Sequence, residues 1–269
     1  THTQSRRQRQ MCIRDRLSIM VNEEDHIRLQ SLLSGLRLKE GWELVDRVDE
    51  ELGQILPMAY HHEFGFLTTC PTNVGTGLRA SVLMHLPGLV LTKEIGQVLQ
   101  GLNQVGLTFR GLYGEGSEGV GNFFQVSNQT TLGKSEEDLV DHLDRLAHQV
   151  IEYERQARQI LMKEAPAETE DKIWRAYGLL RYARSLSFEE LINLLSGVRL
   201  GAGLKLLPGL RVYTVNKIMI YSQKAHLEQA AGRDLPPPEL DAHRASFVRR
   251  LLVSEGVGAS EGEESSEGK

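Results

Sequence analysis

The chain has 269 residues, of which 40% are hydrophobic, 25% charged and 6% aromatic, with a formal net charge of −5 and an isoelectric point near 6.0. This composition is typical of a globular protein, the acidic balance argues against broad nucleic-acid binding, and two cysteines exclude a disulfide scaffold or a four-cysteine zinc site. No stretch reaches the roughly 18 apolar residues of a membrane helix, so we expect a cytoplasmic protein with no nucleic-acid or membrane partner.

The two ends of the chain differ from its middle. Residues 1–16 hold five arginines against one aspartate and lack the apolar core of a signal peptide. This segment is either a nucleic-acid-binding arm or a foreign extension. Its sequence, RQRQMCIRDR, favours a non-native extension. Residues 254–269 hold five glutamates, four glycines, four serines and no aromatic residue, so we expect a disordered acidic tail.

The region from Leu17 to about Gln129 alternates short apolar runs with glycine-rich turns, which predicts strands. The predicted strands are Leu17–Val21, Ile27–Leu32, Phe64–Thr68, Leu107–Tyr113 and Phe123–Ser127. Apolar residues at three- and four-residue spacing predict a helix from Leu44 to Leu56. Leu78–Leu91 and Lys93–Val105 are also predicted to be helices, with Pro87 kinking or ending a turn of the first.

After Gly133 the pattern is helical. Ser135 is placed to cap a helix that runs to about Lys163, and Ser187-Phe-Glu-Glu190 matches a capping box at the start of another. Further helices are predicted over residues 168–184, 212–230 and 239–253. The predicted fold class is therefore α+β, with a mixed sheet domain over 17–133 followed by a mainly helical domain over 134–253.

Three segments carry the residues suited to chemistry. Asn22–Arg28 (NEEDHIR) places three consecutive carboxylates at a strand end, where they need a nearby cation unless the segment is an ordinary solvated turn. Thr69–Ser81 (TCPTNVGTGLRAS) offers backbone N–H groups to an anion, or is a plain connection with an inert cysteine. Arg110–Gly121 is rich in glycine, and its GxGxxG pattern is a weak signal because a strand rather than a helix follows it.

These segments supply Arg28, Arg79 and Arg110, one from each. Three guanidinium groups that converge can neutralise the β- and γ-phosphates of a triphosphate and stabilise the transferring phosphoryl group. Glu24 and Glu115 would then hold a cationic acceptor, because a carboxylate pair can orient a guanidinium for in-line attack and accept its proton.

The motifs NEEDHIR, CPTNVGTGLRAS and RGLYGEG, in this order, closely resemble the ATP:guanido phosphotransferase family. Within the family the chain is most similar to the bacterial protein arginine kinases, on YGEGSEGVGNFFQVSNQTTLGKSEED and on the helical continuation with DAHRA near its end. The resemblance covers roughly Leu17 to Leu252. It implies an antiparallel sheet flanked by helices, followed by a helical C-terminal domain for dimerisation and phosphoarginine binding.

The resemblance also implies roles for individual residues. Glu24 and Glu115 match the carboxylates that orient and deprotonate the substrate guanidinium, and Cys70 matches the family's reactive catalytic cysteine. Arg28, Arg79 and Arg110 match the arginines that bind the phosphates of ATP. The nucleotide-binding segments correspond to Arg79, Ala80, Ser81, Val82 and Leu83, and to Arg110, Gly111, Leu112, Tyr113, Gly114 and Glu115.

The implied activity is transfer of the γ-phosphoryl group of ATP, with Mg²⁺, to arginine side chains of proteins. The subgroup marks proteins for a Clp unfoldase–protease, disables a heat-shock repressor in the stress response, works as a homodimer and is assisted by a zinc-binding activator protein. Two alternatives stay open: a kinase for free arginine or another small guanidino compound, and a catalytically inactive phosphoarginine-binding fragment. No metal site of the protein's own is expected, because His61-His62 lacks an HExxH pattern.

The sequence departs from the family pattern in two places. Nothing before Leu17 matches the family's N-terminal segment, whose serine–arginine motif also binds ATP phosphates, so we expect an N-terminally truncated kinase. The phosphoarginine-binding motif RDxxRA reads Leu240-Asp241-Ala242-His243-Arg244-Ala245. Asp241 and Arg244 are expected to keep the allosteric role, with binding weakened by the leucine.

Overall fold

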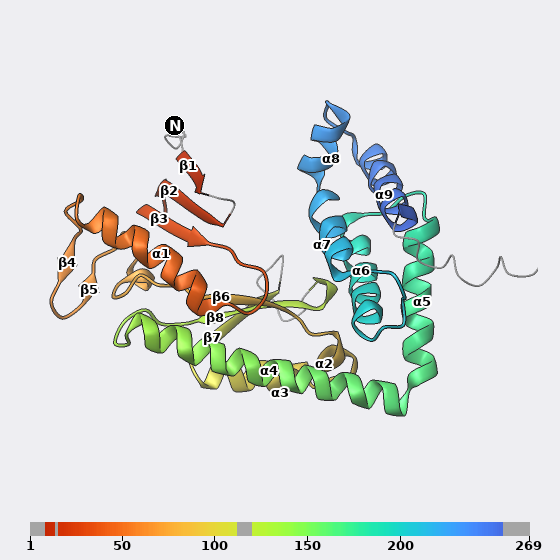
Figure 1. The fold of residues 1–269 in the computed structure, drawn as a ribbon, viewed down its shortest axis with the longest axis horizontal. Helices are drawn as coiled ribbons and strands as arrows, with labels where there is room; N and C mark the ends of the chain where they lie inside the picture. The colour runs from red at the N-terminus through yellow and green to blue at the C-terminus, as the bar shows by residue number, and fades with distance from the viewer. Residues whose placement is uncertain (1–8, 14–15, 112–119, 255–269) are drawn as a thin grey trace, which may run out of the picture. The chain divides into compact units, whose positions relative to one another are not determined.

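The structure, a computed structural model, describes residues 9–13, 16–111 and 120–254 (Figure 1). Its strands are β1 (Arg9–Ile13), β2 (Leu17–Glu23), β3 (Asp25–Ser31), β4 (Tyr60–His61), β5 (Gly65–Phe66), β6 (Ser81–His85), β7 (Leu107–Gly111) and β8 (Phe123–Asn128). Its helices are α1 (Leu38–Gly53), α2 (Pro87–Leu91), α3 (Ile95–Gln104), α4 (Glu136–Glu164), α5 (Pro166–Tyr182), α6 (Phe188–Gly203), α7 (Val212–Tyr221), α8 (Lys224–Ala231) and α9 (Pro237–Ser254), with short 3₁₀ turns η1 (Pro71–Asn73) and η2 (Val120–Asn122). The predicted acidic tail from residue 255 onward and the loop residues Leu112, Tyr113, Gly114 and Glu115 lie outside the described residues.

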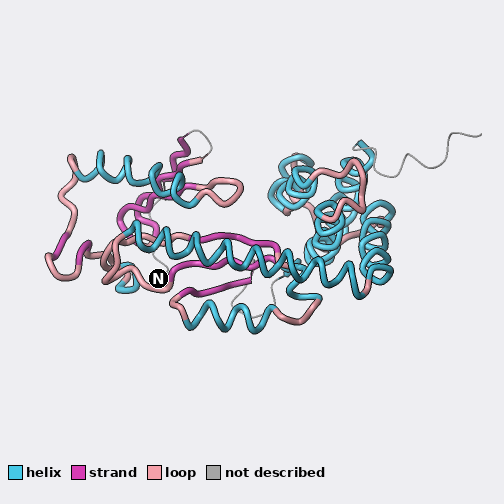
Figure 2. The backbone as a smooth tube through the Cα atoms, turned by 60° about the horizontal axis from the view of Figure 1, so that its bottom comes forward, coloured by secondary structure: helices cyan, strands magenta, loops and turns pink. Residues whose placement is uncertain are grey.

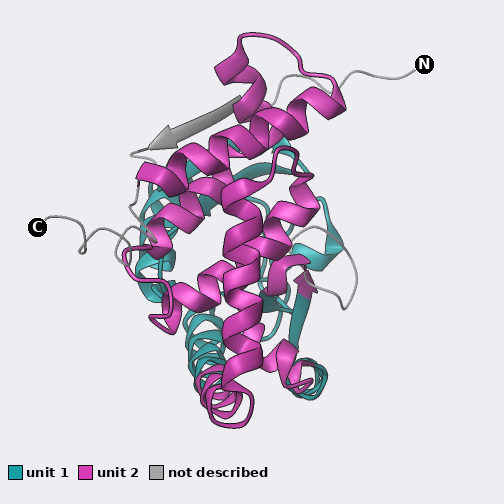
Figure 3. Ribbon diagram, turned by 90° about the vertical axis from the view of Figure 1, so that its right-hand side faces the viewer, with its two compact units in different colours: residues 1–84, 96–109, 125–152 teal, residues 85–95, 110–124, 153–269 magenta. Residues whose placement is uncertain are grey.

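The chain forms two compact units that are interleaved in sequence (Figure 3). The first unit comprises residues 1–84, 96–109 and 125–152, and the second comprises 85–95, 110–124 and 153–269. The predicted domains, 17–133 and 134–253, are each contiguous in sequence, unlike these two units, and they stay a prediction. No helix in the described ranges is long and apolar enough to cross a membrane.

The first unit begins with an antiparallel sheet in the order β1-β2-β3. Strands β2 and β3 form a tight hairpin in which Glu23 pairs with Asp25, so Glu24 forms the turn and adopts a left-handed φ of 63°. Helix α1 packs against β3, where the Ser31 hydroxyl donates to the carbonyl of Gly41 at 2.8 Å. Partly buried apolar residues on α1 follow the helical spacing that the sequence predicts.

The rest of the first unit is built on helical segments and a short hairpin. Strands β4 and β5 pair antiparallel, and Phe66 bridges to Gly75 in the following loop. Along the first part of α4, Leu139, Leu143 and Val150 are buried at helical spacing. His142 on the same helix contacts the carbonyl of Val105 at 3.1 Å through its Nε2 atom, which ties α4 to the end of α3.

A second sheet has the order β6-β8-β7. Backbone hydrogen bonds from Asn128 to Ala80 and from Leu86 to Asn122 show that β6 and β8 run antiparallel. Antiparallel sheets combined with helices confirm the predicted α+β class.

The second unit is mainly helical, and the described chain forms no strand after β8 (Figure 2). Helix α5 packs against α6 and α9, and α7 packs against α6 and α9. Their apolar faces form one core that includes Leu180, Leu191, Ile218, Val248 and Leu252. The predicted cap is confirmed, because the Ser187 hydroxyl accepts the backbone N–H of Glu190 at 3.1 Å.

Two polar groups of the second unit, one buried and one partly buried, form defined hydrogen bonds. Glu154 on α4 is 5% exposed, and its carboxylate accepts the backbone N–H groups of Gly88 and Leu89 at 2.9 and 3.0 Å, so it caps the start of α2. His85 lies within 2.8 Å of the Ser196 hydroxyl and 4.7 Å from the Phe123 ring. Burial, followed by nearby arginine charges, lowers the pKa of His85 to about 2, so its ring is neutral at physiological pH.

The predicted helix over Leu78–Leu91 is wrong. Residues 81–85 form β6, and only residues 87–91 form a helix. A short apolar run fits a buried strand as well as a helix, and pairing with β8 decides between them. Pro87 does not kink a helix but begins one, at a position where its missing N–H costs nothing. The predicted helix over 212–230 is likewise two helices, α7 and α8, which are separated at Ser222.

Candidate active site

The hairpin of β2 and β3 carries the first group of predicted site residues. Arg28 on β3 points its Nη1 atom at the carboxylate of Glu23, at 2.7 Å, and lies 3.8 Å from that of Glu24. The cation that three consecutive carboxylates require is therefore supplied by the same motif. Arg28 and Glu24 are each about half exposed, so a ligand can reach both. The structure thus brings one predicted phosphate-binding arginine together with one predicted catalytic carboxylate.

Asp25 connects this hairpin to the loop that contains Cys70. Its Oδ1 atom accepts the backbone N–H groups of Thr69 at 2.7 Å and of Cys70 at 3.3 Å, and its Oδ2 atom accepts the side-chain amide of Asn73 at 2.8 Å. Burial acts to raise the pKa of Asp25, but these hydrogen bonds outweigh it and hold the pKa below its usual value. The carboxylate is therefore ionised and fixes the Cys70 loop beside Glu24 and Arg28.

Cys70 itself is partly buried and is not in a disulfide. Its Sγ atom lies 3.0 Å from the hydroxyl of Thr72, and its carbonyl accepts the hydroxyl of Thr68 at 2.6 Å. Pro71 then starts the 3₁₀ turn η1. The thiol is held in one place, with a hydroxyl close enough to donate a hydrogen bond to a thiolate.

The end of this loop closes on Thr131. The Thr131 hydroxyl donates to the carbonyl of Val74 at 2.8 Å, and its own carbonyl accepts the N–H of Thr76 at 2.9 Å. Gly75, between them, has a φ of 114°, and a Cβ atom there would lie 2.3 Å from the Thr131 carbonyl oxygen. Only glycine fits this close approach of two backbone segments.

Asn128 forms hydrogen bonds with the backbone on both sides of Arg79. Its Oδ1 atom accepts the N–H of Ala80 at 2.8 Å, and its side-chain amide donates to the carbonyl of Leu78 at 3.0 Å. Asn128 is 6% exposed, whereas Arg79 is exposed and forms no hydrogen bond or ion pair with any residue that the structure describes. The guanidinium of Arg79 is therefore available to a ligand on a backbone that is held in place.

The remaining predicted nucleotide residues lie on strands of the second sheet. Ala80 precedes β6, and along it Ser81 and Leu83 are exposed while Val82 is partly buried. On β7, Arg110 is exposed and Gly111 is buried. The catalytic Glu115, together with Leu112, Tyr113 and Gly114, lies outside the described residues. Convergence of Arg28, Arg79 and Arg110 therefore stays a prediction.

The two predicted phosphoarginine-binding residues lie on α9 of the second unit. Arg244 is 2% exposed and donates to the carbonyls of Ser222 at 3.0 Å and Leu186 at 2.7 Å, and it pairs with Asp241. Its guanidinium thus joins α9 to the end of α7 and to the segment before α6. The structure gives Arg244 a role in packing, and its role in ligand binding stays a prediction.

Sequence reasoning did not single out Asp25, Asn128 or Thr131 as site residues. Asp25 stands inside the NEEDHIR motif, where it was grouped with its neighbours, and Asn128 ends the apolar strand FFQVSN. A polar residue in an otherwise buried strand signals a hydrogen-bonding role. Its partners, 48 and 50 residues earlier in the chain, cannot be identified from that signal.

Family comparisons agree with this geometry. Residues 2–157 match the family model of the ATP:guanido phosphotransferase C-terminal catalytic domain, which is more than half of the chain. The chain belongs to the ATP:guanido phosphotransferase family. Within that family, residues 166–264 match the model of the protein-arginine kinase McsB C-terminal domain.

Two curated relatives refine the place of the chain within the ATP:guanido phosphotransferases. It is 51% identical over 238 residues to a protein-arginine kinase of Desulforamulus reducens, covering 88% of this chain and 67% of the relative. It is 46% identical over 251 residues to a protein-arginine kinase of Bacillus subtilis, covering 93% of this chain and 69% of the relative. The crystal structure of a lombricine kinase matches with 30% identity and a TM-score of 0.46, over 52% of this chain and 39% of that one.

The residues of the site are chemically suited to a nucleotide rather than to a metal ion alone. Within the described ranges, no group of three or more His, Cys, Asp or Glu side chains could hold a metal. Arg28 and Arg79 instead present guanidinium groups, which bind phosphate oxygens.

Proposed function

We propose that the chain transfers the γ-phosphoryl group of ATP to arginine side chains of proteins. The observation that carries the proposal is the link made by Asp25, which holds the Cys70 loop against the hairpin of Glu24 and Arg28. Membership of the ATP:guanido phosphotransferase family and the similarity to protein-arginine kinases support the choice of donor and acceptor.

The arginines act on the donor. Arg28 uses its Nη1 atom for Glu23, and its other guanidinium donors are available to a phosphate oxygen. Arg79 forms no hydrogen bond or ion pair with another described residue, so its guanidinium can bind a phosphate. Arg110 is exposed on β7. Fixed positive charge is the main catalytic requirement of phosphoryl transfer, because the transition state spreads negative charge over the γ-phosphoryl oxygens.

The carboxylates act on the acceptor. We propose that Glu24 and Glu115 hold the substrate guanidinium and orient one nitrogen toward the γ-phosphorus. A new P–N bond forms as the P–O bond to ADP breaks, and the proton lost by that nitrogen passes to a carboxylate. Such a proton acceptor is necessary because a guanidinium has a pKa above about 12 and its nitrogens are poor nucleophiles while it is protonated. Cys70, fixed by Asp25 and Thr72, contributes negative charge beside the acceptor when it is a thiolate.

Finer features of the activity are proposed on the family resemblance. Mg²⁺ accompanies ATP, and the enzyme acts in the cytoplasm as a homodimer. Its substrates include a heat-shock repressor, its products are delivered to a Clp unfoldase–protease, and a zinc-binding protein activates it. Asp241 and Arg244 are proposed to take part in sensing phosphoarginine.

The test is mass spectrometry of an arginine-rich protein incubated with the chain and Mg-ATP near neutral pH, where the acid-labile P–N bond survives. We expect phosphoarginine with the unaltered chain and a loss of at least about a hundredfold for Glu24→Gln or Glu115→Gln. Glu63→Gln is the matched control, since Glu63 is an exposed carboxylate in the β4–β5 turn. A parallel sample with free arginine distinguishes a small-guanidino kinase. Absence of phosphoarginine in every sample, with ATP bound normally, contradicts the proposal.

A further inference from the structure

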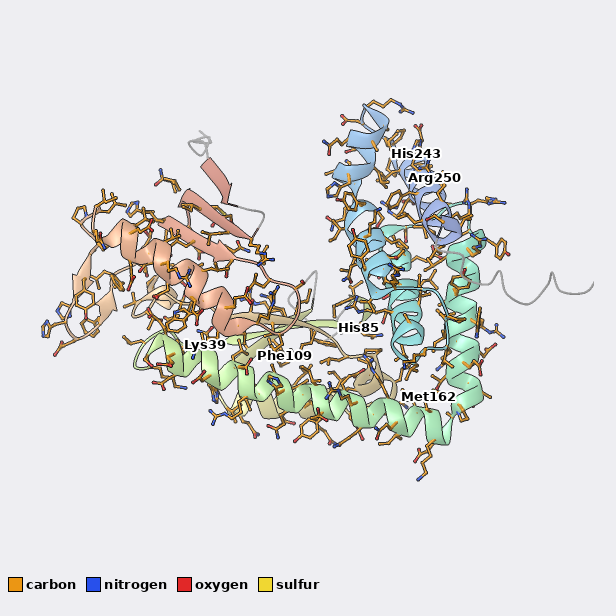
Figure 4. All side chains as sticks on the ribbon, in the orientation of Figure 1. Lys39, His85, Phe109, Met162, His243 and Arg250 are labelled. Atoms are coloured by element: carbon orange, nitrogen blue, oxygen red, sulfur yellow. The ribbon has the colours of Figure 1, made fainter. Side chains whose placement is uncertain are left out.

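The end of helix α5 and helix α9 of the second unit line an open surface cavity of about 490 Å³. Four arginines line it, two from the end of α5 and the residues after it and two from α9: Arg181, Arg184, Arg249 and Arg250. Tyr182 and Ser246 complete its polar wall. Figure 4 labels Arg250 on α9. We name this site the arginine pocket.

The arginine pocket concentrates positive charge without a matching negative charge. No carboxylate lines it, and none of its four arginines forms a salt bridge within the described ranges. Four guanidinium groups around one cavity repel one another. This arrangement is favourable when an anion occupies the cavity.

Hydrogen bonding in the pocket is also incomplete. The Nη1 atom of Arg181 is buried and has no hydrogen-bond partner in the structure. Arg249 donates to the carbonyl of Ala183, which positions its guanidinium but leaves other donors unused. Buried donors in folded proteins almost always have an acceptor, so the unpaired Nη1 atom shows that the acceptors of the protein do not satisfy the guanidinium of Arg181.

The size and chemistry of the cavity specify the ligand class. A volume of about 490 Å³ lies in the usual range for small-molecule sites and exceeds what a bare ion needs. Several arginine forks match the oxygens of a phosphoryl group bidentately. The Ser246 hydroxyl can add a neutral donor, and the ring of Tyr182, 73% exposed, offers a face for the group that carries the phosphoryl.

We propose that the arginine pocket binds the phosphoryl group of a phosphorylated ligand. The pocket uses neither Asp241 nor Arg244, and its lining residues all belong to the second unit. The pocket is thus separate from the residues assigned to catalysis. Binding to it is measured without turnover, so the test of this proposal does not depend on the proposed activity.

The experiment is isothermal titration calorimetry of the full chain at low ionic strength with three probes: inorganic phosphate, phosphoarginine and ATP. All titrations use an Arg28→Ala, Arg79→Ala background, which removes two arginines proposed to bind phosphates elsewhere. Replacing Arg184 and Arg250 by alanine removes two exposed guanidinium groups from the pocket without touching the core. We expect the Kd of the preferred probe to rise by at least about tenfold.

Lys172→Ala with Arg175→Ala is the matched control, because it removes two exposed positive charges from α5 outside the pocket. This control should leave the Kd within about twofold, since exposed charges at a distance are screened. Tighter binding of phosphoarginine than of phosphate assigns the ligand to phosphorylated arginine, and tighter binding of ATP assigns it to a nucleotide. Equal losses in both double variants, or no saturable binding of any probe, overturn the proposal.

The chain's own acidic segment is the competing occupant, because residues 255–269 hold five glutamates and follow directly on α9. Changing these five glutamates to glutamine tests it. If the probes bind only after that change, the pocket belongs to the acidic segment, and the phosphoryl-ligand proposal is overturned.

Discussion

The side-chain carboxylate of Asp25 accepts a hydrogen bond of 2.8 Å from the side-chain amide of Asn73, 48 residues further along the chain. With the two backbone N–H groups that it also accepts, this carboxylate fixes the position of the Cys70 loop. A residue with no proposed contact to substrate thus determines where the proposed catalytic groups lie. Positioning of this kind has large kinetic effects, because phosphoryl transfer depends on alignment.

Replacing Asp25 by alanine should therefore reduce the rate of arginine phosphorylation by about 10- to 100-fold. The fold should persist, because Asp25 is at a hairpin end and the hydrophobic core does not include it. Asp25→Asn should show a smaller loss, since an amide oxygen can still accept the N–H of Thr69 but its NH₂ opposes the donor of Asn73. Initial rates at saturating ATP, together with thermal melting of each variant, measure both effects.

Glu63→Ala is the control for this prediction, as an exposed carboxylate of the same unit. The pKa of Asp25 is lowered in the folded chain, so its contribution to stability is complete above the unfolded value of 3.8 and disappears only as pH falls through the lower folded value. Asp25→Ala should accordingly remove stability at pH 7 without changing the pH dependence between 5 and 8. An unchanged rate in Asp25→Ala would show that the loop is held by other means.

Asn128→Ala should raise the KM for ATP more than it lowers kcat. The substitution leaves the N–H of Ala80 and the carbonyl of Leu78 without their partner, at a cost of about 1–3 kcal/mol in the free energy of unfolding. Because Arg79 lies between them, its backbone loses its fixed position, and we expect the KM for ATP to rise by about tenfold. Steady-state kinetics against ATP concentration test this, with the exposed neighbour Gln129→Ala as control. A lower kcat at unchanged KM would instead assign Asn128 to the acceptor side.

Much of the helical region could be predicted from sequence, because its signals are local. The hydroxyls of Ser135 and Ser187 accept the N–H groups three residues later, as their capping patterns predict. The prediction of a helix over Leu78–Leu91 is wrong because strand pairing, which depends on residues far away in the sequence, overrides the local apolar periodicity. The site shows the same division: sequence identifies Glu24, Arg28 and Cys70, but the link through Asp25 spans 44 to 48 residues and depends on the fold.

Stability should fall as the solution becomes acidic because of His85. The pKa of this histidine is lowered from 6.5 to about 2 in the folded chain, so below pH 6.5 the unfolded chain binds a proton that the folded chain does not. The free energy of unfolding then decreases by up to about 1.4 kcal/mol for each pH unit below 6.5. Urea unfolding at several values between pH 7.5 and 5 measures the slope.

His85→Gln should flatten that slope, since glutamine retains a hydrogen-bonding group near Ser196 and does not titrate. His243→Gln is the matched control, because His243 is an exposed histidine on α9 (Figure 4). His85→Gln leaves the carboxylates unchanged, whereas His243→Gln affects only Glu239, which lies 3.7 Å from His243, so the difference in slope between the unaltered chain and His85→Gln is the informative one. Parallel curves for the unaltered chain and His85→Gln would refute the assignment.

Arg244→Ala should destabilise the second unit by about 3 kcal/mol. The change removes a buried guanidinium and leaves the carbonyls of Leu186 and Ser222 and the carboxylate of Asp241 without their donor. Arg233→Ala is the control, since Arg233 forms an exposed ion pair with Glu239 at one end of the same helix, and its loss should leave the unfolding midpoint nearly unchanged. Similar unfolding midpoints for the two variants would show that Arg244 is reserved for a ligand rather than for packing.

The interleaving of the two units affects how the protein can be divided. The chain passes from one unit to the other at residues 84, 95, 109, 124 and 152, and the last of these points lies in the middle of α4. No single cleavage therefore releases one unit on its own, and a cut between the two family matches, after residue 157 and before 166, divides the second unit while it leaves every segment of the first on one piece. After protease nicking at that place, the two pieces should stay together through the contacts that α6 makes with η2 and α2 inside the second unit, and they should separate only when that unit unfolds.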